Sequence, residues 1–141
     1  MRESAKLSKS QYETLAAFRY ALRQFLRFSE EAAQAVGIPP QQHQALLAIK
    51  GFPSRDSVTV SELTERLQLR HHSTVGLIDR LVEEKLVLRT PSDKDRRQIL
   101  IKLTPKGEKI LEKLSFAHSK QLRHMGPELK ILLNRLGAVK D

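Results

Sequence analysis

Apolar residues recur at helical spacing over the first part of the chain. Between about Ser10 and Val36 they form a stripe with i, i+3, i+4 spacing, which runs through Leu15, Phe18, Leu22, Phe25, Ser29 and Ala32. Gly37, followed by Pro39 and Pro40, is typical of a helix end. This pattern predicts one long amphipathic helix near the N-terminus.

Three shorter helices are predicted in the middle of the chain. The first begins at Pro40, since proline suits a first helical turn, and ends near Gly51. A short β-prone stretch, residues 57–60, leads into Thr59 and Glu62, which fit a capping box. A turn at residues 68–70 then separates the helix that this box begins from a third helix over residues 71–85. Its buried stripe is expected at Val75, Ile78, Leu81 and Val82.

A two-stranded hairpin with a charged tip is predicted next. The strands are residues 87–90 and 98–103, and the tip is the polar loop 91–97. In the second strand Ile99, Ile101 and Leu103 alternate with Gln98, Leu100 and Lys102, which is the period of a half-buried strand.

The last part of the chain is again helical. Thr104 is a helix-capping residue and Pro105 suits the first helical position, so a long helix is expected from here past Leu122. We expect Gly126 and Pro127 to break it. A last short helix would carry Leu129, Leu132, Leu133 and Leu136.

The predicted fold class is mainly α with a small β-wing. Residues 40–103 form a winged helix-turn-helix DNA-binding lobe, flanked by N-terminal (1–39) and C-terminal (104–141) dimerisation helices in one intertwined domain. The outer helices are long for the centre that they flank, so a second copy of the chain is expected to cover their apolar stripes. The alternative is that they pack only on each other.

Composition narrows the class of partner. The 141 residues carry a formal net charge of +9, which attracts polyanions: DNA, RNA or an acidic membrane surface. A uniformly basic protein without a specific site is the alternative. The absence of cysteine excludes disulfides, thiolate zinc sites and thiol nucleophiles. No signal-peptide pattern and no apolar run of the ~20 residues that a membrane span needs are visible, so we expect a cytoplasmic protein without membrane partners.

The third of the middle helices is the candidate recognition helix. With Ile78 pointing into the core, its opposite arc holds His72, Ser73, Gly76, Arg80 and Glu83. Short polar side chains and arginines read base edges in the major groove. Gly76 costs about 1 kcal/mol in a helix interior, so it either lets the backbone approach a groove wall or is a tolerated surface glycine. The candidate DNA-binding residues here are Arg70, His71, His72, Ser73, Thr74, Gly76 and Arg80.

Positive charge gathers where the recognition helix begins. Arg70, His71 and His72 lie there, and free N–H groups at a helix N-terminus suit a phosphate. A zinc site is the weaker interpretation, because adjacent histidines on a helix diverge by about 100°. For His71 the helical wheel leaves a packed structural histidine as an alternative. We expect no metal and no cofactor.

The charged hairpin tip is the second candidate DNA contact. Its cations can enter a minor groove, where negative potential is concentrated, and its aspartates can fix an arginine by hydrogen bonds. A solvated turn is the alternative. Arg89 and Lys102 on the strands are expected to contact phosphates. The candidate DNA-binding residues of the hairpin are Arg89, Lys94, Asp95, Arg96 and Arg97.

The chain resembles the MarR family of transcription regulators over about residues 40–110. The likeness is carried by four segments: Val60-Ser61-Glu62-Leu63-Thr64-Glu65-Arg66-Leu67, His72-Ser73-Thr74-Val75-Gly76-Leu77-Ile78-Asp79-Arg80-Leu81, Asp93-Lys94-Asp95-Arg96-Arg97, and Ile101-Lys102-Leu103-Thr104-Pro105-Lys106-Gly107. Two positions depart from the family: Arg70 stands where a small N-cap residue is common, and Lys85 where a glycine is common. The first departure therefore leaves the start of the helix open, and with the second we expect a different turn into the wing.

The resemblance implies a homodimer that binds a pseudo-palindromic DNA operator. It also implies that Arg97 probes the minor groove while Asp95 steadies it. Family members usually act as repressors that small, often aromatic or lipophilic anions release from DNA. Arg19, Arg23 and Arg27, beside three phenylalanines, form either an anion pocket or a solvated helix flank. The effector stays unassigned.

Two other classes of function are alternatives. An enzyme is not expected, because no Gly-rich phosphate loop, nucleophile elbow or metal-spaced ligand pair is present in the sequence. A non-specific architectural or RNA-binding protein without effector control is the main alternative. It gives no reason for the polar arc on the recognition helix, and aromatic stacking platforms typical of RNA binding are absent from the sequence.

Overall fold

The computed structural model describes residues 6–137. The first five residues, part of the segment in which no leader pattern was found, and residues 138–141 lie outside this range. The chain divides into two compact units. We call residues 32–115 the central lobe, and residues 6–31 together with 116–137 the helical unit.

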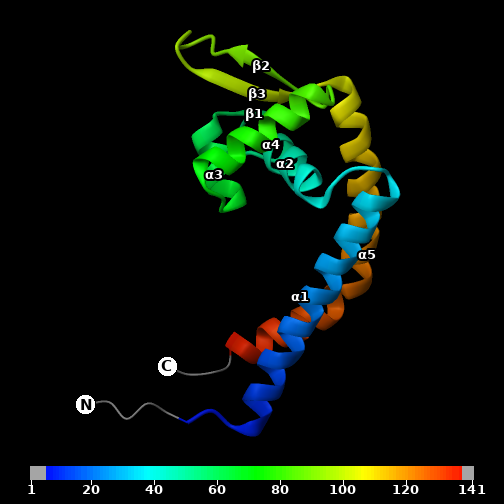
Figure 1. Ribbon diagram of the computed structural model, residues 1–141. Coiled ribbons are helices and arrows are strands. Elements are labelled where there is room, and N and C mark those ends of the chain that lie inside the picture. Colours follow the sequence, from blue (N-terminus) through cyan, green and yellow to red (C-terminus); the bar gives the residue numbers. More distant parts are fainter. Residues whose placement is uncertain (1–5, 138–141) are drawn as a thin grey trace, which may run out of the picture. The chain divides into compact units, whose positions relative to one another are not determined.

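The predicted order of elements is confirmed as far as the hairpin, and one continuous helix follows it in place of the two that were expected (Figure 1). The elements are α1 (Lys9–Ala35), α2 (Pro40–Lys50), β1 (Ser57–Val58), α3 (Val60–Leu67), α4 (His71–Glu83), β2 (Val87–Pro91), β3 (Ile99–Leu103) and α5 (Pro105–Gly137). Within the described residues, no helix combines the length and the apolar character that a membrane crossing requires.

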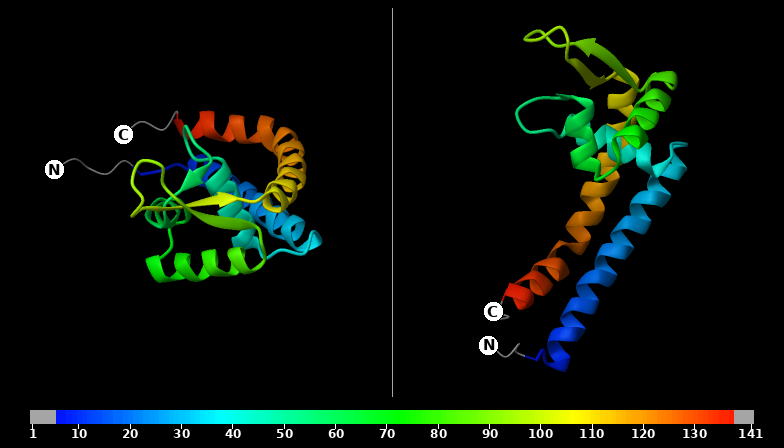
Figure 2. Two further views of the ribbon diagram at one scale, coloured as in Figure 1. Left: turned by 90° about the horizontal axis from the view of Figure 1, so that it is seen from above. Right: turned by 60° about the vertical axis from the view of Figure 1, so that its left-hand side comes forward.

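The strands of the central lobe form an antiparallel sheet in the order β1-β3-β2. The predicted hairpin pairs Val87 with Leu103 and Pro91 with Ile99. The sequence did not predict that β1 pairs with β3 on the side away from β2, where Ser57 lies opposite Lys102. Figure 1 and the right-hand view of Figure 2 show α2, α3 and α4 on one side of the hairpin, with its tip beyond them.

The core of the central lobe lies between these helices and the sheet. Its largest fully buried side chains include Leu46, Ile49, Val58, Leu63, Leu77, Ile78, Leu81 and Ile101. Burying one such aliphatic side chain contributes about 1.5–3 kcal/mol. Two details correct the predicted pattern. On α4 the inner stripe includes Leu77, while Val75 and Val82 are only half-buried. In β3, Ile99 is 43% exposed, because it lies at the tip end of the hairpin.

A tight turn joins α4 to β2. Lys85 adopts a φ of 61°, a left-handed conformation that glycine adopts at lower cost. The N–H of Lys85 donates to the carbonyl of Val82 (3.0 Å), and that of Leu86 donates to the carbonyl of Leu81 (2.9 Å), which is the Schellman pattern. Lys85 therefore makes the turn for which glycine is best suited, and the expected change in this turn does not occur.

The first turn of α5 packs directly against this turn. The hydroxyl of Thr104 donates to the carbonyl of Lys85 (2.6 Å) and accepts from the N–H of Gly107 (3.1 Å). This confirms Thr104 as a capping residue. Gly107 is buried, and a Cβ there would lie 2.1 Å from the carbonyl oxygen of Leu86. Only glycine fits this contact without a shift of the backbone.

The predicted break at Gly126 and Pro127 is wrong. Helix α5 is continuous from Pro105 to Gly137, with Pro127 inside it. A proline removes one backbone hydrogen bond and crowds the carbonyl four residues earlier. Met125 and Leu132, on either side, are both buried. Their burial in a single helix offsets the local loss at Pro127.

In the helical unit, α1 and α5 meet at His118. Its ring lies edge-on to Phe25 and Phe28, with centroid separations of 5.9 and 5.4 Å, and its Nε2 is hydrogen-bonded to the Ser29 hydroxyl (2.8 Å). Many apolar side chains of this unit are nevertheless exposed in the single chain: Tyr12, Leu15, Tyr20, Leu22, Leu26, Phe116, Leu122, Ile131 and Leu133.

Candidate nucleic-acid interface

Helix α3, the first helix of the helix-turn-helix, begins at the predicted capping box. The N–H of Glu62 donates to the Thr59 hydroxyl (3.2 Å), and the N–H of Thr59 donates to the Glu62 carboxylate (2.9 Å). The Arg55 guanidinium pairs with the same carboxylate. Burial alone would raise the pKa of Glu62, but the hydrogen bond from the Thr59 backbone and the Arg55 charge outweigh it and lower that pKa.

The recognition helix α4 presents the polar arc that the sequence predicted. His72, Ser73, Arg80 and Glu83 are exposed, and Gly76 is half-buried. A Cβ built on Gly76 would have Nη1 of Arg80, at 3.8 Å, as its nearest neighbour among the described side chains. This is an ordinary contact distance. The fold of the chain therefore does not require glycine at position 76.

The start of α4 is now defined. Arg70 is the N-cap residue with extended backbone (φ −82°, ψ 152°), and among the described residues its side chain makes no capping hydrogen bond. His71, the first helical residue, is exposed. The alternative of a packed structural His71 is therefore wrong, because this residue precedes the part of α4 that packs on the core. Arg70, His71 and His72 are all accessible at this helix end.

The structure corrects the inclusion of Thr74 among the candidate DNA contacts. Thr74 is fully buried, and its hydroxyl donates to the backbone carbonyl of Arg70 (3.2 Å). It lies one helical turn before the buried Ile78, on the same inward side. Thr74 therefore supports the helix start from within and does not reach a ligand.

The hairpin tip is held by hydrogen bonds of its own. The N–H of Arg97 donates to Oδ1 of Asp95 (3.0 Å), and the N–H of Gln98 donates to the Asp95 carbonyl (3.0 Å). Asp95 thus fixes the backbone beside Arg97. The aspartate predicted to hold an arginine contacts the main chain of Arg97 rather than its guanidinium.

Ser92 is a part of this tip that sequence reasoning missed. Its N–H donates to the Gln98 carbonyl (2.9 Å), and its buried hydroxyl accepts from the N–H of Lys94 (3.3 Å). The side chains of Lys94, Arg96 and Arg97 remain exposed. The turn therefore presents three cations on an ordered backbone.

The two cations expected on the wing strands are both paired with carboxylates. Arg89 on β2 pairs with Asp79 on α4, and Lys102 on β3 lies 3.9 Å from a carboxylate oxygen of Asp56. Both partners come from other elements of the lobe, so no local sequence pattern could reveal them.

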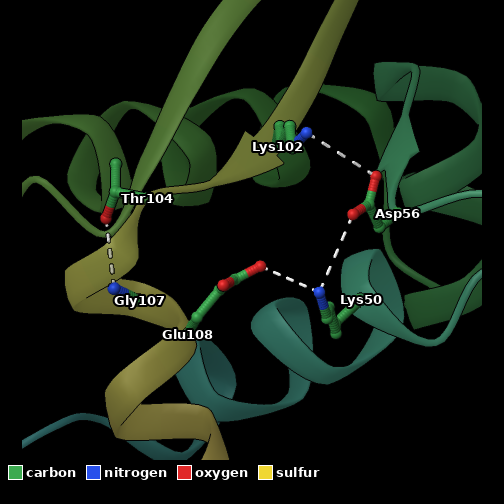
Figure 3. A network of polar contacts seen from close by, with 6 residues as sticks. All are labelled: Lys50, Asp56, Lys102, Thr104, Gly107 and Glu108. Atoms are coloured by element: carbon green, nitrogen blue, oxygen red, sulfur yellow. Dashed lines mark hydrogen bonds and ion pairs between the residues drawn. The ribbon is translucent and has the colours of Figure 1, made fainter.

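Lys102 belongs to a wider polar network (Figure 3). Lys50 Nζ lies 2.8 Å from the Glu108 carboxylate and 3.7 Å from Asp56. The hydrogen bond to Glu108 raises the pKa of Lys50 above its ordinary value, although partial burial opposes the shift. The network connects α2 and α5 with the loop before β1 and with strand β3.

Only two of the three arginines considered for an anion pocket line the same hollow. Arg23 and Arg27 line a hollow of about 590 Å³ in the helical unit, together with Tyr20 and Phe28, whereas Arg19 is not among its lining residues. Arg27 Nε is paired with the Glu31 carboxylate (3.1 Å). Within residues 6–137, no three side chains of His, Asp or Glu come together in a way that could hold a metal ion.

Comparison with known proteins places this lobe among relatives. The MarR family pattern matches residues 36–98. The HTH-type transcriptional repressor MdtR of Bacillus subtilis (strain 168) is 33% identical over 78 residues, which are 55% of this chain and 48% of MdtR. The uncharacterized HTH-type transcriptional regulator YsmB of the same organism is 35% identical over 87 residues, 62% of this chain and 57% of YsmB. The chain therefore spans about half the length of these curated relatives.

Solved structures extend the likeness beyond the lobe. A MarR family protein from Bacillus stearothermophilus matches with a TM-score of 0.74 at 25% identity, over 86% of this chain and 82% of that one. A mutant of Staphylococcus aureus MepR bound to an oligodeoxyribonucleotide matches with a TM-score of 0.65 at 18% identity, over 93% and 96% of the two chains. The second match shows the fold alone. Sequence pattern, curated relatives and winged-helix geometry agree: residues 36–98 match the MarR family, and the chain has the fold of a solved MarR family protein.

Proposed function

We propose that the protein is a sequence-specific regulator of transcription that binds duplex DNA as a homodimer. The observation that carries the proposal is the exposed surface of α4, where a glycine and short polar residues occupy the arc opposite the core. In this proposal α4 enters the major groove, and the hairpin tip with Arg97 enters the adjacent minor groove.

Charge supports duplex DNA as the partner. The net charge of +9 attracts the phosphate backbone, and the cations of the tip and of the α4 start are exposed in the same lobe. The MepR mutant, which has the same fold, was solved with an oligodeoxyribonucleotide.

The exposed apolar side chains of the helical unit support a homodimer. Nine large apolar residues of this unit are at least 42% exposed in the described part of the single chain. An apolar surface of this kind favours association, and two-fold symmetry is the commonest way to cover it. We expect each copy to occupy one half of a pseudo-palindromic operator.

We further propose that the protein represses its targets and that a small lipophilic or aromatic anion releases it from DNA. The name of MdtR describes a repressor, which supports this sign of regulation. The test of release is a preformed protein–DNA complex challenged with aromatic carboxylates such as benzoate. A fall in the bound fraction is expected, and full retention at millimolar concentrations would contradict this part of the proposal.

The decisive experiment is the selection of bound duplexes from random DNA, followed by titration of the selected and scrambled duplexes. Specific binding predicts a preference of about 10³ or more and half-sites about 10 base pairs apart, centre to centre. Equal affinity for both duplexes, from a protein that sediments as a monomer, would favour the architectural alternative instead.

A further inference from the structure

A basic side chain of the wing is paired with an acidic side chain of the recognition helix. Nη2 of Arg89, on β2, donates to Oδ1 of Asp79, on α4. The two side chains are 40% and 60% exposed. We infer that Arg89 is a positioning residue that holds the wing against the recognition helix through Asp79, and thereby contributes to sequence specificity. This inference rests on the proposed function.

The sequence of α4 leaves Asp79 dependent on a partner from elsewhere. Side chains three or four positions apart face each other on a helix. The residues at these positions around Asp79 are Val75, Gly76, Val82 and Glu83, and none of them is a cation. The positive charge that Arg89 supplies from β2 therefore neutralises a carboxylate that would otherwise repel phosphates near the exposed arc of α4.

The position of the pair explains how it can orient the wing. Helix α4 and strand β2 are joined by the turn around Lys85, and Val87 at the base of the hairpin is buried in the same core as Leu81 of α4. Asp79 lies six residues before this turn and Arg89 lies four residues after it. The core holds the base of the hairpin, and a contact further along both elements limits the bending of the wing beyond that base. The pair thus sets the angle between the element proposed to read the major groove and the one proposed to enter the minor groove.

This role differs from the phosphate contact that the sequence predicted for Arg89. A phosphate contact contributes to all duplexes alike and adds about one to the salt dependence of binding. A positioning contact matters most where both elements must fit their grooves at once, which is on the selected operator. Exposed ion pairs are weak, so the expected effect is about two- to five-fold.

The test compares Arg89→Ala, Asp79→Asn and the double variant with the wild-type protein. Affinity is measured over a range of salt concentrations for the selected duplex and for a scrambled duplex of equal length and composition. Lys102→Ala is the matched control, because it removes one positive charge from the neighbouring strand and leaves the Asp79–Arg89 pair intact. Amide hydrogen exchange of the wing strands is followed in the DNA-free proteins.

We expect both single variants to lower the ratio of selected to scrambled affinity by about two- to five-fold, the double variant to lower it no further, and the salt dependence to stay unchanged. In both single variants the backbone amides of the wing strands should exchange faster than in the wild-type protein. The inference is overturned if Arg89→Ala lowers the affinity for both duplexes equally and flattens the salt dependence by about one while Asp79→Asn strengthens binding. It is also overturned if hydrogen exchange of the wing amides is the same in the variants and the wild-type protein. Absence of any preference in the wild-type protein would instead refute the proposed function, and the exchange measurement would still decide the role of Arg89.

Discussion

Gly107 lies against the backbone carbonyl of Leu86 at a distance that excludes any side chain, since an added Cβ would stand 2.1 Å from the oxygen. The contact joins the first turn of α5 to the segment between α4 and β2. Backbone atoms on both sides leave no flexible group that could yield.

Gly107→Ala is therefore expected to lower the free energy of unfolding by about 3 kcal/mol, as overpacking against rigid atoms does. Thermal and urea unfolding of the two proteins would measure the difference. Gly76→Ala is the matched control, because its new Cβ would meet only the Arg80 guanidinium at 3.8 Å. A Gly107→Ala variant as stable as the wild type would mean that α5 does not approach the turn as described.

For Gly76 the expected results for folding and binding have opposite signs. Gly76→Ala should stabilise the helix by about 1 kcal/mol, since space is available, yet weaken binding to the selected duplex if the α4 backbone approaches a groove wall. Unfolding and DNA titration on the same preparation separate the two effects. Unchanged affinity would identify Gly76 as a tolerated surface glycine.

Substitutions at Arg70 can also distinguish an effect on stability from an effect on DNA affinity. Arg70→Ser supplies the missing N-cap acceptor and should stabilise α4 by about 1 kcal/mol, while loss of the cation should reduce affinity for all duplexes. Arg70→Ala is the control that removes the charge without adding a cap. If both variants bind as tightly as the wild type, Arg70 makes no phosphate contact.

At the wing tip, Arg97→Ala is expected to weaken binding to every duplex and to flatten the plot of log K against log salt concentration by about one. Asp95→Ala should weaken binding by releasing the Arg97 backbone, whereas Asp95→Asn retains an acceptor oxygen for the same N–H and should bind nearly as well. Equal losses in the two Asp95 variants would show that charge at this position matters more than the turn.

The depressed pKa of Glu62 predicts acid sensitivity. A carboxyl whose pKa is lower in the folded than in the unfolded state stabilises the fold above its unfolded pKa, about 4.3, and loses this contribution as the pH falls through the folded value. Glu62→Gln keeps the capping box but not the charge. The stability difference between wild type and variant should therefore be present at pH 7 and shrink below about pH 4.3. A difference that does not vary with pH would contradict the pairing with Arg55.

The parts of the fold that depend on nearby residues could be predicted from the sequence. Capping at Thr59 and Thr104, the hairpin and the order of the helices up to the start of α5 follow from patterns within a few positions, and the structure confirms them. The pairing of β1 with β3 and the ion pair between Arg89 and Asp79 join segments that no local pattern connects.

The helical wheel correctly predicted the exposure of the polar arc of α4, at His72, Ser73, Arg80 and Glu83, and the errors lie near the start of this helix. The wheel already placed Thr74 one turn before Ile78, so its burial was open to inference. For His71 the wheel indicated a position on the core side. This residue is exposed, because the first residue of a helix can lie beyond the end of the core on which the helix packs. At Pro127 the local preference for a break was real, but burial of the residues around it prevailed.

The hydrogen bonds within the hairpin tip affect the free energy of binding. Flexible loops lose conformational entropy when a ligand fixes them, at a cost of about 1–2 kcal/mol for each backbone residue that becomes ordered. Residues 92–98 are linked to one another by backbone hydrogen bonds centred on Ser92 and Asp95, which restrict the loop before a ligand arrives. Attraction between Arg97 and a polyanion is then offset by a smaller ordering cost than in a loop without such hydrogen bonds, so this small turn can contribute to affinity out of proportion to its size.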